Sequence, residues 1–314
     1  MSDSSDTLVV GTRGSQLARA QTRWVIDRVR EANPALAVRM EIIRTTGDAL
    51  QSQPLPEIGG KGLFTAELEQ ALQAGSIDLA VHSAKDLPTD LSEGLALLAY
   101  PPREDPRDAW IAADGRPLMD LPQGSVVGTG SLRRQAQLLM HRPDLRFVGL
   151  RGNVDTRIRK IREGQVAGAV LAMAGLNRAG LAPHVTHVLD PDFCLPAPGQ
   201  GALGLEGRAN DERVRALLAP LHDPMTARAV ECERAILAAL DAGCRAPVAV
   251  HAVADAVGLR CDALVIHPSG RPALRASASE SGDAAGSARA VVDRIVRDLR
   301  AAGADAIVAE CRAR

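Results

Sequence analysis

Two segments of this chain repeat one pattern: a short apolar run, a glycine-containing turn, a serine and nearby arginines. The first, VVGTRGSQLARAQ, starts at Val9, and the second, VVGTGSLRRQAQL, starts at Val126. The pattern predicts a buried strand followed by a helix, because a serine at a helix start accepts a hydrogen bond from a free backbone N–H group. One such junction is common in α/β proteins. Two copies indicate two halves that are built alike.

Apolar runs of strand length alternate with helical periodicity along the first two-thirds of the chain. Runs at 8–12, 38–43 and 77–83 are separated by helices expected from about Ser15 and from about Leu63. A proline-rich, charged stretch, PPREDPRD, reads as a crossover. The alternation then resumes with runs at 109–113, 125–129, 145–150 and 168–174, and with helices expected from Ser131 and near Val154. This order predicts two units of parallel βαβ type.

The composition changes again after the proline-rich segment LPAPGQGA. Two alanine-rich helices are expected at about 212–218 and 225–239, followed by three short alternating runs and a closing helix from about Gly286. This part predicts a small α+β domain. A length of 314 residues is consistent with two or three domains.

Composition disfavours several classes of protein. Net charge is -1 and aromatic residues make up 2% of the chain, so the basic and aromatic surface of a single-strand nucleic-acid binder is missing. The first six residues lack the basic and apolar regions of a secretory signal, and no apolar run reaches the roughly 18 residues that span a bilayer. The five cysteines are widely spaced and form no CxxC, which argues against a disulfide framework or a zinc site. We therefore expect a cytoplasmic protein with no metal site.

Basic residues gather at the predicted turns and helix starts. They are Arg13, Lys61, Lys85, Arg133, Arg134, Arg151, Arg157 and Arg178. Arginine binds carboxylate or phosphate through two parallel hydrogen bonds, and helix N-termini favour anions, so the pattern predicts a ligand with several acidic groups. A single arginine is equally well explained as a solvated or ion-paired surface residue, but for Arg133 and Arg134, which follow a Gly-Thr-Gly-Ser turn, ligand binding is favoured. No GxxxxGK[ST] or GxGxxG motif follows a strand, so nucleotide binding is weakly supported.

Two further residues are candidates for chemistry. Asp86 lies in VHSAKDLP, directly after a predicted strand, where ligand chemistry occurs in doubly wound sheets. An aspartate there can stabilise a cation, although capping of the turn before the proline is a serious alternative. Cys244 lies in the loop DAGCRAP beside Gly243 and Arg245, a setting that favours an accessible thiolate. No histidine forms a nucleophile-base pattern with it, so hydrolase chemistry is not predicted.

Nine ordered motifs resemble the hydroxymethylbilane synthase family, also called the porphobilinogen deaminases. They are GTRGSQLA, GGKGLFTAELE, VHSAKDLP, REDPRDA, GTGSLRRQAQL, LRGNVDTR, AMAGLNR, PAPGQGA and ERA with GCRAP. The resemblance implies two α/β domains like those of type II periplasmic binding proteins and a small C-terminal α+β domain. The expected boundaries are residues 1–101 with 202–220, residues 106–197 and residues 224–314. A return segment near ALGLEG would close the first domain.

The resemblance also implies an activity. Four porphobilinogen molecules would be condensed head to tail, each losing ammonia, onto a dipyrromethane cofactor held by the Cys244 sulfur as a thioether. Hydrolysis would then release 1-hydroxymethylbilane, a precursor of porphyrins and heme. Each pyrrole carries an acetate and a propionate, which explains a concentration of arginine in a chain of nearly zero net charge.

Residue roles follow from the same resemblance. Asp86 matches the catalytic aspartate, which hydrogen-bonds pyrrole N–H groups and stabilises the azafulvenium formed as ammonia leaves. Cofactor binding is implied for Cys244, Lys85, Ser131, Arg133, Arg134, Arg157, Ser83, Asp48 and Gly130. Substrate binding is implied for Arg13, Ser15, Arg151, Arg178 and Gln200. Lys61 and Phe64 would belong to a lid.

A competing class remains open. The same two-domain fold serves non-catalytic binding modules that clamp anions. The expected third domain with its cysteine favours the enzyme, because a sequestering protein needs no reactive thiol. We expect a monomer whose partner is the small-molecule substrate, with neither nucleic acid nor membrane bound.

Overall fold

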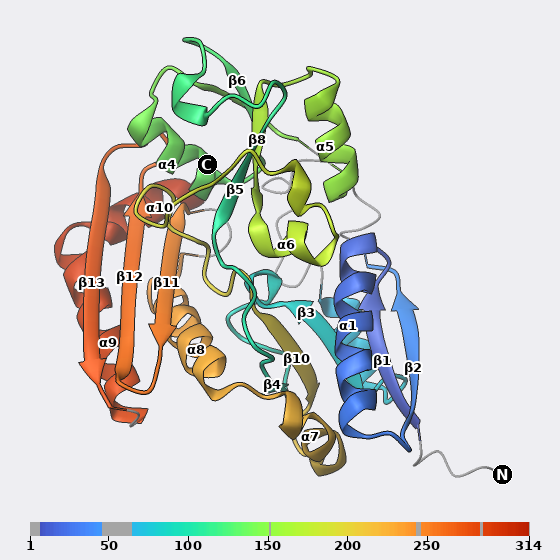
Figure 1. The fold of residues 1–314 in the computed structure, drawn as a ribbon. Coiled ribbons are helices and arrows are strands. Elements are labelled where there is room, and N and C mark those ends of the chain that lie inside the picture. The colour runs from blue at the N-terminus through green and yellow to red at the C-terminus, as the bar shows by residue number, and fades with distance from the viewer. Residues whose placement is uncertain (1–6, 46–64, 151, 243–245, 283–284, 314) are drawn as a thin grey trace. The chain divides into compact units, whose positions relative to one another are not determined.

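The computed structural model describes residues 7–45, 65–150, 152–242, 246–282 and 285–313. The chain divides into two compact units, Met1–Glu104 with Ala202–Ala227 and Asp105–Gly201 with Arg228–Arg314. Both units contain a five-stranded sheet with helices on its faces, and the second unit also holds a three-stranded sheet (Figure 1).

The sheet of the first unit has the strand order β2-β1-β3-β10-β4. Its strands are β1 (Thr7–Arg13), β2 (Ala37–Ile43), β3 (Leu79–Ser83), β4 (Leu95–Ala99) and β10 (Leu203–Arg208). The first three are parallel, and β10 runs antiparallel to β3 and β4. Helices α1 (Gln16–Ala32) and α7 (Glu212–Leu218) pack on one face and α3 (Ala66–Gln73) on the other. Successive β1 residues alternate between these two layers: Val10 contacts the α1 side and Val9 the α3 side.

The large sheet of the second unit has the order β7-β6-β8-β5-β9, the same arrangement as the first sheet. Its strands are β5 (Asp108–Ala112), β6 (Val126–Gly128), β7 (Arg146–Val148), β8 (Gly168–Ala172) and β9 (His187–Val188). Strands β6, β7 and β8 are parallel, and β5 is antiparallel to β8 and β9. Helix α4 (Leu132–His141) covers one face, while α5 (Val154–Arg162) and α6 (Met173–Arg178) cover the other.

The second repeat of the sequence thus takes the same place in its sheet as the first, because β6 corresponds to β1 and α4 to α1. The apolar run at 109–113 behaves differently from a strand in a parallel βαβ unit, since β5 is antiparallel to its neighbours. A short run that is buried on both faces carries no sign of its direction.

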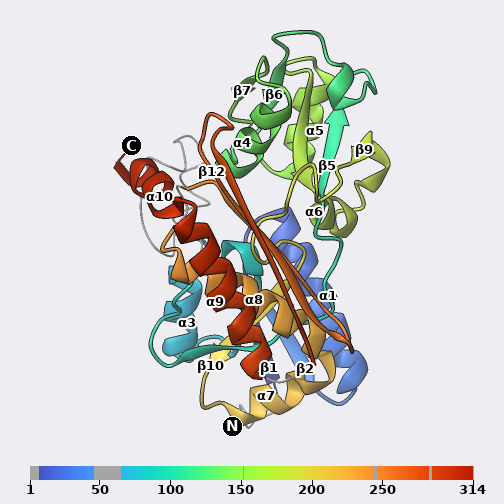
Figure 2. The same cartoon turned by 90° about the vertical axis from the view of Figure 1, so that its left-hand side faces the viewer.

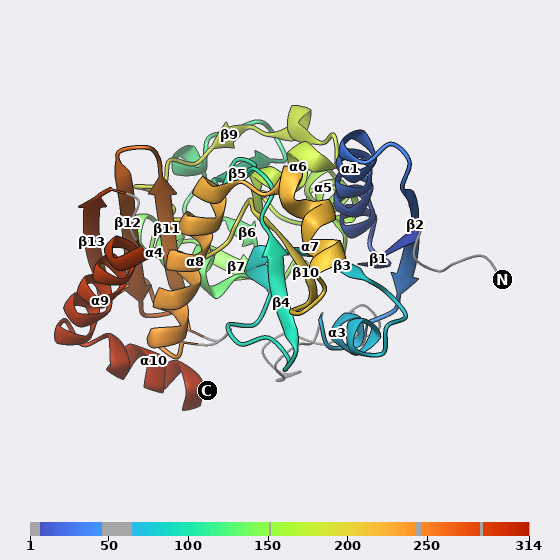
Figure 3. The ribbon, with the colours of Figure 1, turned by 90° about the horizontal axis from the view of Figure 1, so that it is seen from below.

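A three-stranded antiparallel sheet forms the C-terminal part, with β11 (Val248–Ala254), β12 (Gly258–Ile266) and β13 (Ala273–Ser281). Helices α8 (Pro224–Ala239), α9 (Ala285–Ala301) and α10 (Ala304–Ala313) bury one face of this sheet; Figure 2 shows α9 along it and Figure 3 shows α8 and α9 on the same side. The opposite face contacts α4, where Leu264 and Ala249 pack against Ala136. Short 3-10 helices complete the described chain: η2 (Ala84–Asp86), η3 (Leu118–Asp120), η4 (Ala182–His184) and η5 (Ala219–Leu221).

The predicted fold class is confirmed: two α/β sheets are followed by a smaller α+β part. The expected return segment is β10, which inserts between β3 and β4 of the first sheet. The boundaries of the three expected domains stay a prediction. Among the described residues, no helix has both the length and the apolar character needed to cross a membrane.

Candidate active site

Asp86 lies at the carboxyl end of a central strand of the first sheet. Strand β3 ends at Ser83 and continues into η2, whose last two residues are Lys85 and Asp86. Both of these side chains are exposed. Within the described residues, no hydrogen bond or ion pair engages the Asp86 carboxylate, so both of its oxygens can accept hydrogen bonds from a ligand.

The first repeat supplies groups to the same edge of this sheet. Arg13 is the last residue of β1, and Ser15 is the N-cap of α1, with its Oγ accepting a hydrogen bond from Ala18 N at 3.2 Å. Because β1 and β3 are parallel neighbours, their carboxyl ends meet at one edge. Arg13, Ser15 and Asp86 are therefore brought to the same side of the first unit.

The second repeat forms an equivalent junction in the second unit. Strand β6 leads through Gly130, which is exposed, to Ser131, the N-cap of α4. The Ser131 Oγ accepts a hydrogen bond from Arg134 N at 3.4 Å, and Ser131 N donates to Thr129 Oγ1 at 3.2 Å. The predicted serine cap is confirmed at both junctions.

Arg133 and Arg134 are buried and share one carboxylate, that of Asp108. Arg133 Nη1 lies 2.8 Å from Asp108 Oδ2 and donates to Leu195 O at 2.6 Å. Arg134 donates to Asp108 Oδ1 from Nη2 at 2.7 Å and from Nε at 3.1 Å, and to Val170 O from Nη1 at 3.0 Å. Both guanidinium groups are thus anchored inside the protein, and their contact with ligand carboxylates stays a prediction.

The electrostatics of this cluster keep Asp108 ionised. Burial alone would raise the pKa of the Asp108 carboxyl, but Arg133 and Arg134 together outweigh burial and hold that pKa well below its usual value of 3.8. The neighbouring Cys194 thiol donates to Asp108 Oδ2 at 3.4 Å, and burial, reinforced by Asp108, raises the pKa of this thiol to about 12. Cys194 is therefore neutral and a poor nucleophile at neutral pH.

This lowered pKa predicts how stability changes in acid. The free energy of unfolding that Asp108 contributes is present in full above its unfolded pKa and is lost as pH falls toward its folded pKa. Urea unfolding of the unaltered protein and of Asp108→Asn is expected to give a difference in unfolding free energy that narrows below about pH 4. A difference that stays constant from pH 6 to the lowest pH at which both proteins fold would contradict this assignment.

Other predicted site residues of the second unit are also held by internal contacts. Gln200 is fully buried and donates from Nε2 to Asp108 Oδ1 at 2.9 Å and to Pro106 O at 2.7 Å. Arg178 Nη2 donates to Gly201 O at 2.8 Å, and Arg157 Nε donates to Gly152 O at 2.9 Å. Arg157 and Arg178 lie in the helices that follow β7 and β8, whose carboxyl ends share the edge of β6.

Several predicted residues lie outside the described part of the chain: Asp48, Lys61, Phe64, Arg151 and Cys244. The four other cysteines are Cys194, Cys232, Cys261 and Cys311, and each is at most 5% exposed. A ligand cannot reach their sulfur atoms without opening a protein core.

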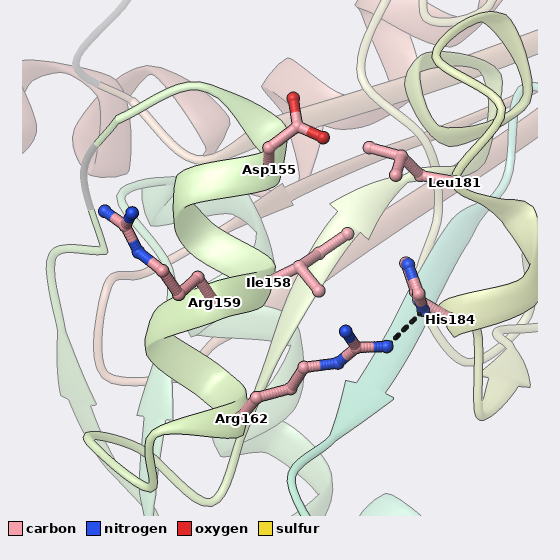
Figure 4. Close-up of a pocket in the computed structure, with 6 residues that line it drawn as sticks. All are labelled: Asp155, Ile158, Arg159, Arg162, Leu181 and His184. Atoms are coloured by element: carbon pink, nitrogen blue, oxygen red, sulfur yellow. Dashed lines mark hydrogen bonds between the residues drawn. The ribbon is translucent and has the colours of Figure 1, made fainter.

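A separate small pocket lies on α5, and none of the predicted site residues lines it (Figure 4). Its volume is about 170 Å³, and its walls are formed by Asp155, Ile158, Arg159, Arg162, Leu181 and His184. Arg162 Nη2 and His184 Nδ1 are 2.8 Å apart across it. Residues 155, 158, 159 and 162 share one face of the helix, while Arg157 projects from the other side.

Two buried carboxylates were not identified from the sequence as parts of the site. The sequence singles out Asp108 only as a member of the motif REDPRDA. Glu233 of α8 is fully buried and accepts backbone hydrogen bonds from Gly199 at 2.6 Å and from Ala252 at 2.7 Å. These two hydrogen bonds link the loop that contains Gln200 with strand β11. In the sequence Glu233 stands out only as part of the motif ERA, because the charged residues Glu231 and Arg234 lie beside it in the same helix.

The two five-stranded sheets have matching strand orders. Each has a capped helix and basic side chains at the carboxyl ends of its parallel strands. Together they define a duplicated α/β protein suited to anionic ligands. Family profiles described as "Porphobilinogen deaminase, dipyromethane cofactor binding domain" and "Porphobilinogen deaminase, C-terminal domain" match residues 8–216 and 227–299. The chain belongs to the porphobilinogen deaminase family, as its motifs predicted.

Two relatives support this assignment over nearly the full length. The porphobilinogen deaminase of Syntrophotalea carbinolica is 49% identical over 306 residues, which cover 98% of this chain and 96% of the relative. That of Roseiflexus castenholzii is 46% identical over 304 residues, which cover 97% and 99%.

Solved structures give more distant likenesses. The methionine binding protein MetQ matches with a TM-score of 0.43 and 16% identity over 68% of this chain and 89% of that chain. The periplasmic aliphatic sulphonate binding protein of Escherichia coli matches with a TM-score of 0.41 and 17% identity over 74% and 69%.

Proposed function

We propose that this chain is a hydroxymethylbilane synthase, which condenses four porphobilinogen molecules and hydrolyses the product to 1-hydroxymethylbilane. The observation that carries the proposal is the 46–49% identity to porphobilinogen deaminases over 97–98% of the chain. In each condensation, the carbon–nitrogen bond of a protonated aminomethyl group breaks and ammonia leaves, the methylene carbon forms a carbon–carbon bond with a ring carbon of the next pyrrole, and that ring carbon loses its proton.

The residues present suit a dipyrromethane cofactor with carboxylate side chains. Lys85 is exposed at the edge of the first sheet, and Arg13 and the capped start of α1 lie at the same edge. In the second unit, Ser131, Arg157 and the Arg133–Arg134 pair follow the parallel strands. These donors are cations and N–H or O–H groups, which is the chemistry that carboxylates require. When bound through Cys244, dipyrromethane supplies the pyrrole carbon to which the first substrate is joined.

Roles for the chain's own residues follow from this proposal. Asp86 accepts hydrogen bonds from pyrrole N–H groups, and its negative charge stabilises the positive charge that develops as ammonia leaves. The same carboxylate assists loss of the proton after the bond has formed. The cofactor is bound by Ser83, Gly130, Asp48, Lys85, Ser131, Arg133, Arg134 and Arg157. Substrate is bound by Arg13, Ser15, Arg151, Arg178 and Gln200. A lid contains Lys61 and Phe64. The protein acts as a cytoplasmic monomer.

Incubation with porphobilinogen tests the activity directly. The purified protein is expected to release four molecules of ammonia for each 1-hydroxymethylbilane formed, measured by an ammonia assay and by chromatography of the product. A sample without protein is the control. Saturable binding of porphobilinogen without release of ammonia would support the binding-module alternative instead.

A further inference from the structure

The cluster around Asp108 contains more positive than negative charge. Two guanidinium groups, Arg133 and Arg134, meet one carboxylate, and the adjacent Cys194 thiol is neutral. Gln200 and the carbonyl oxygens of Val170 and Leu195 complete the described surroundings without adding charge. A buried cation without a counter-charge is costly, so the cluster favours one further anion.

The position of the Asp108 carboxylate is fixed from several directions. Its backbone is paired with Ala172 in the β5–β8 ladder. Gln200 Nε2 and Arg134 bind Oδ1, while Arg133 and the Cys194 thiol bind Oδ2. Asp108 itself is fully buried. The carboxylate therefore acts as a rigid acceptor that determines where both guanidinium groups lie.

The two arginines use their donors differently. Arg134 donates to protein acceptors from Nε, Nη1 and Nη2. Among the described residues, the hydrogen bonds and the ion pair of the Arg133 guanidinium are all made by Nη1. Its Nε and Nη2 atoms form the edge that binds a carboxylate through two parallel hydrogen bonds.

We propose that Asp108 is a positioning residue for the reaction: by holding Arg133 through Nη1, it presents the Nε–Nη2 edge of that arginine to one carboxylate of the bound pyrrole chain. This ligand carboxylate also supplies the anion that the cluster favours. The inference rests on the proposed function, and in it Gln200 supports Asp108 through its Nε2 donor, in place of the substrate contact assigned to Gln200 above.

Asp108→Asn tests the proposal because a positioning role and a purely charge-neutralising role predict opposite changes in the KM for porphobilinogen. The asparagine side chain keeps its size but turns one NH₂ group toward an arginine donor, so the guanidinium loses its fixed acceptor. If Asp108 positions Arg133, the KM for porphobilinogen is expected to rise about tenfold, with a smaller change in kcat. The fraction of protein carrying cofactor, measured by intact mass, is expected to fall as well. If Asp108 only neutralised charge, its removal would tighten anion binding, and a KM at or below that of the unaltered protein would overturn the proposal.

Asp144→Asn is the matched control. Asp144 also binds an arginine, accepting from Arg142 Nε and Nη2 at 2.7 Å, but it is partly exposed and lies apart from the serine-capped junction. It is expected to leave KM and the loaded fraction unchanged. A comparable rise in KM for Asp144→Asn would show that loss of any such ion pair has this effect and would overturn the proposal.

Asp108→Glu keeps the proposal testable if the asparagine variant does not fold. It retains the charge but moves the carboxylate by one carbon–carbon bond, so a raised KM at a normal melting temperature is expected. A KM and a loaded fraction equal to those of the unaltered protein would overturn the positioning role. Failure of the unaltered protein to release ammonia would instead contradict the proposed function, so the two failures are distinguishable.

Discussion

Asp86→Asn is expected to lower the kcat for ammonia release by about 10²–10³-fold, the loss typical when one electrostatic group is removed from a developing charge. Asparagine keeps the shape of the side chain and one acceptor oxygen. It loses the negative charge that opposes the cation formed as ammonia leaves, and it cannot take up a proton at neutral pH. Binding of the pyrrole N–H group is retained in part, so KM is expected to change less than kcat.

The structure provides a way to separate this effect from loss of stability. Asp86 is exposed at the end of η2, so its replacement is expected to change the free energy of unfolding by no more than about 0.5 kcal/mol. Asp90→Asn is the control, because Asp90 is another exposed aspartate of the same unit and no role in the reaction is assigned to it. Near-normal ammonia release by Asp86→Asn, in protein that melts normally, would remove Asp86 from the mechanism.

The parts of the fold that could be predicted from sequence are those set by local signals. The two serine caps followed from a glycine turn and a serine before an amphipathic helix, and Ala18 and Arg134 donate the expected backbone hydrogen bonds. The location of Asp86 at a strand end followed from the order of an apolar run, polar residues and a proline. Both features depend on residues that are close in sequence.

The parts that could not be predicted depend on distant residues. Asp108 lies 26 positions before Arg134 and 86 before Cys194, and no spacing rule connects residues so far apart. The direction of β5 is likewise decided by its pairing with β8 and β9. Arginines next to a glycine turn can bind either a ligand or an internal carboxylate. Only the fold shows that Asp108 accepts hydrogen bonds from some of the N–H groups of Arg133 and Arg134.

The remaining large effect concerns Cys244. Cys244→Ser is expected to abolish both cofactor attachment and activity, because a serine hydroxyl stays protonated at neutral pH and is a much weaker nucleophile than a thiolate. Intact-mass measurement is expected to show the unaltered protein heavier than its sequence by one dipyrromethane unit and the variant at its sequence mass. An unmodified mass in unaltered protein that is active would contradict covalent attachment.

Cys311→Ser provides the matched control for this experiment. It makes the same exchange of sulfur for oxygen at a cysteine of the C-terminal part, but Cys311 is only 5% exposed within α10 and packs in the core beneath β11–β13. A polar atom there is expected to reduce stability by about 1–3 kcal/mol without removing the added mass. The other described cysteines are buried as well, so none of them offers an accessible thiol in place of Cys244. Retention of the added mass by Cys244→Ser, or its loss in folded Cys311→Ser, would therefore place the attachment elsewhere.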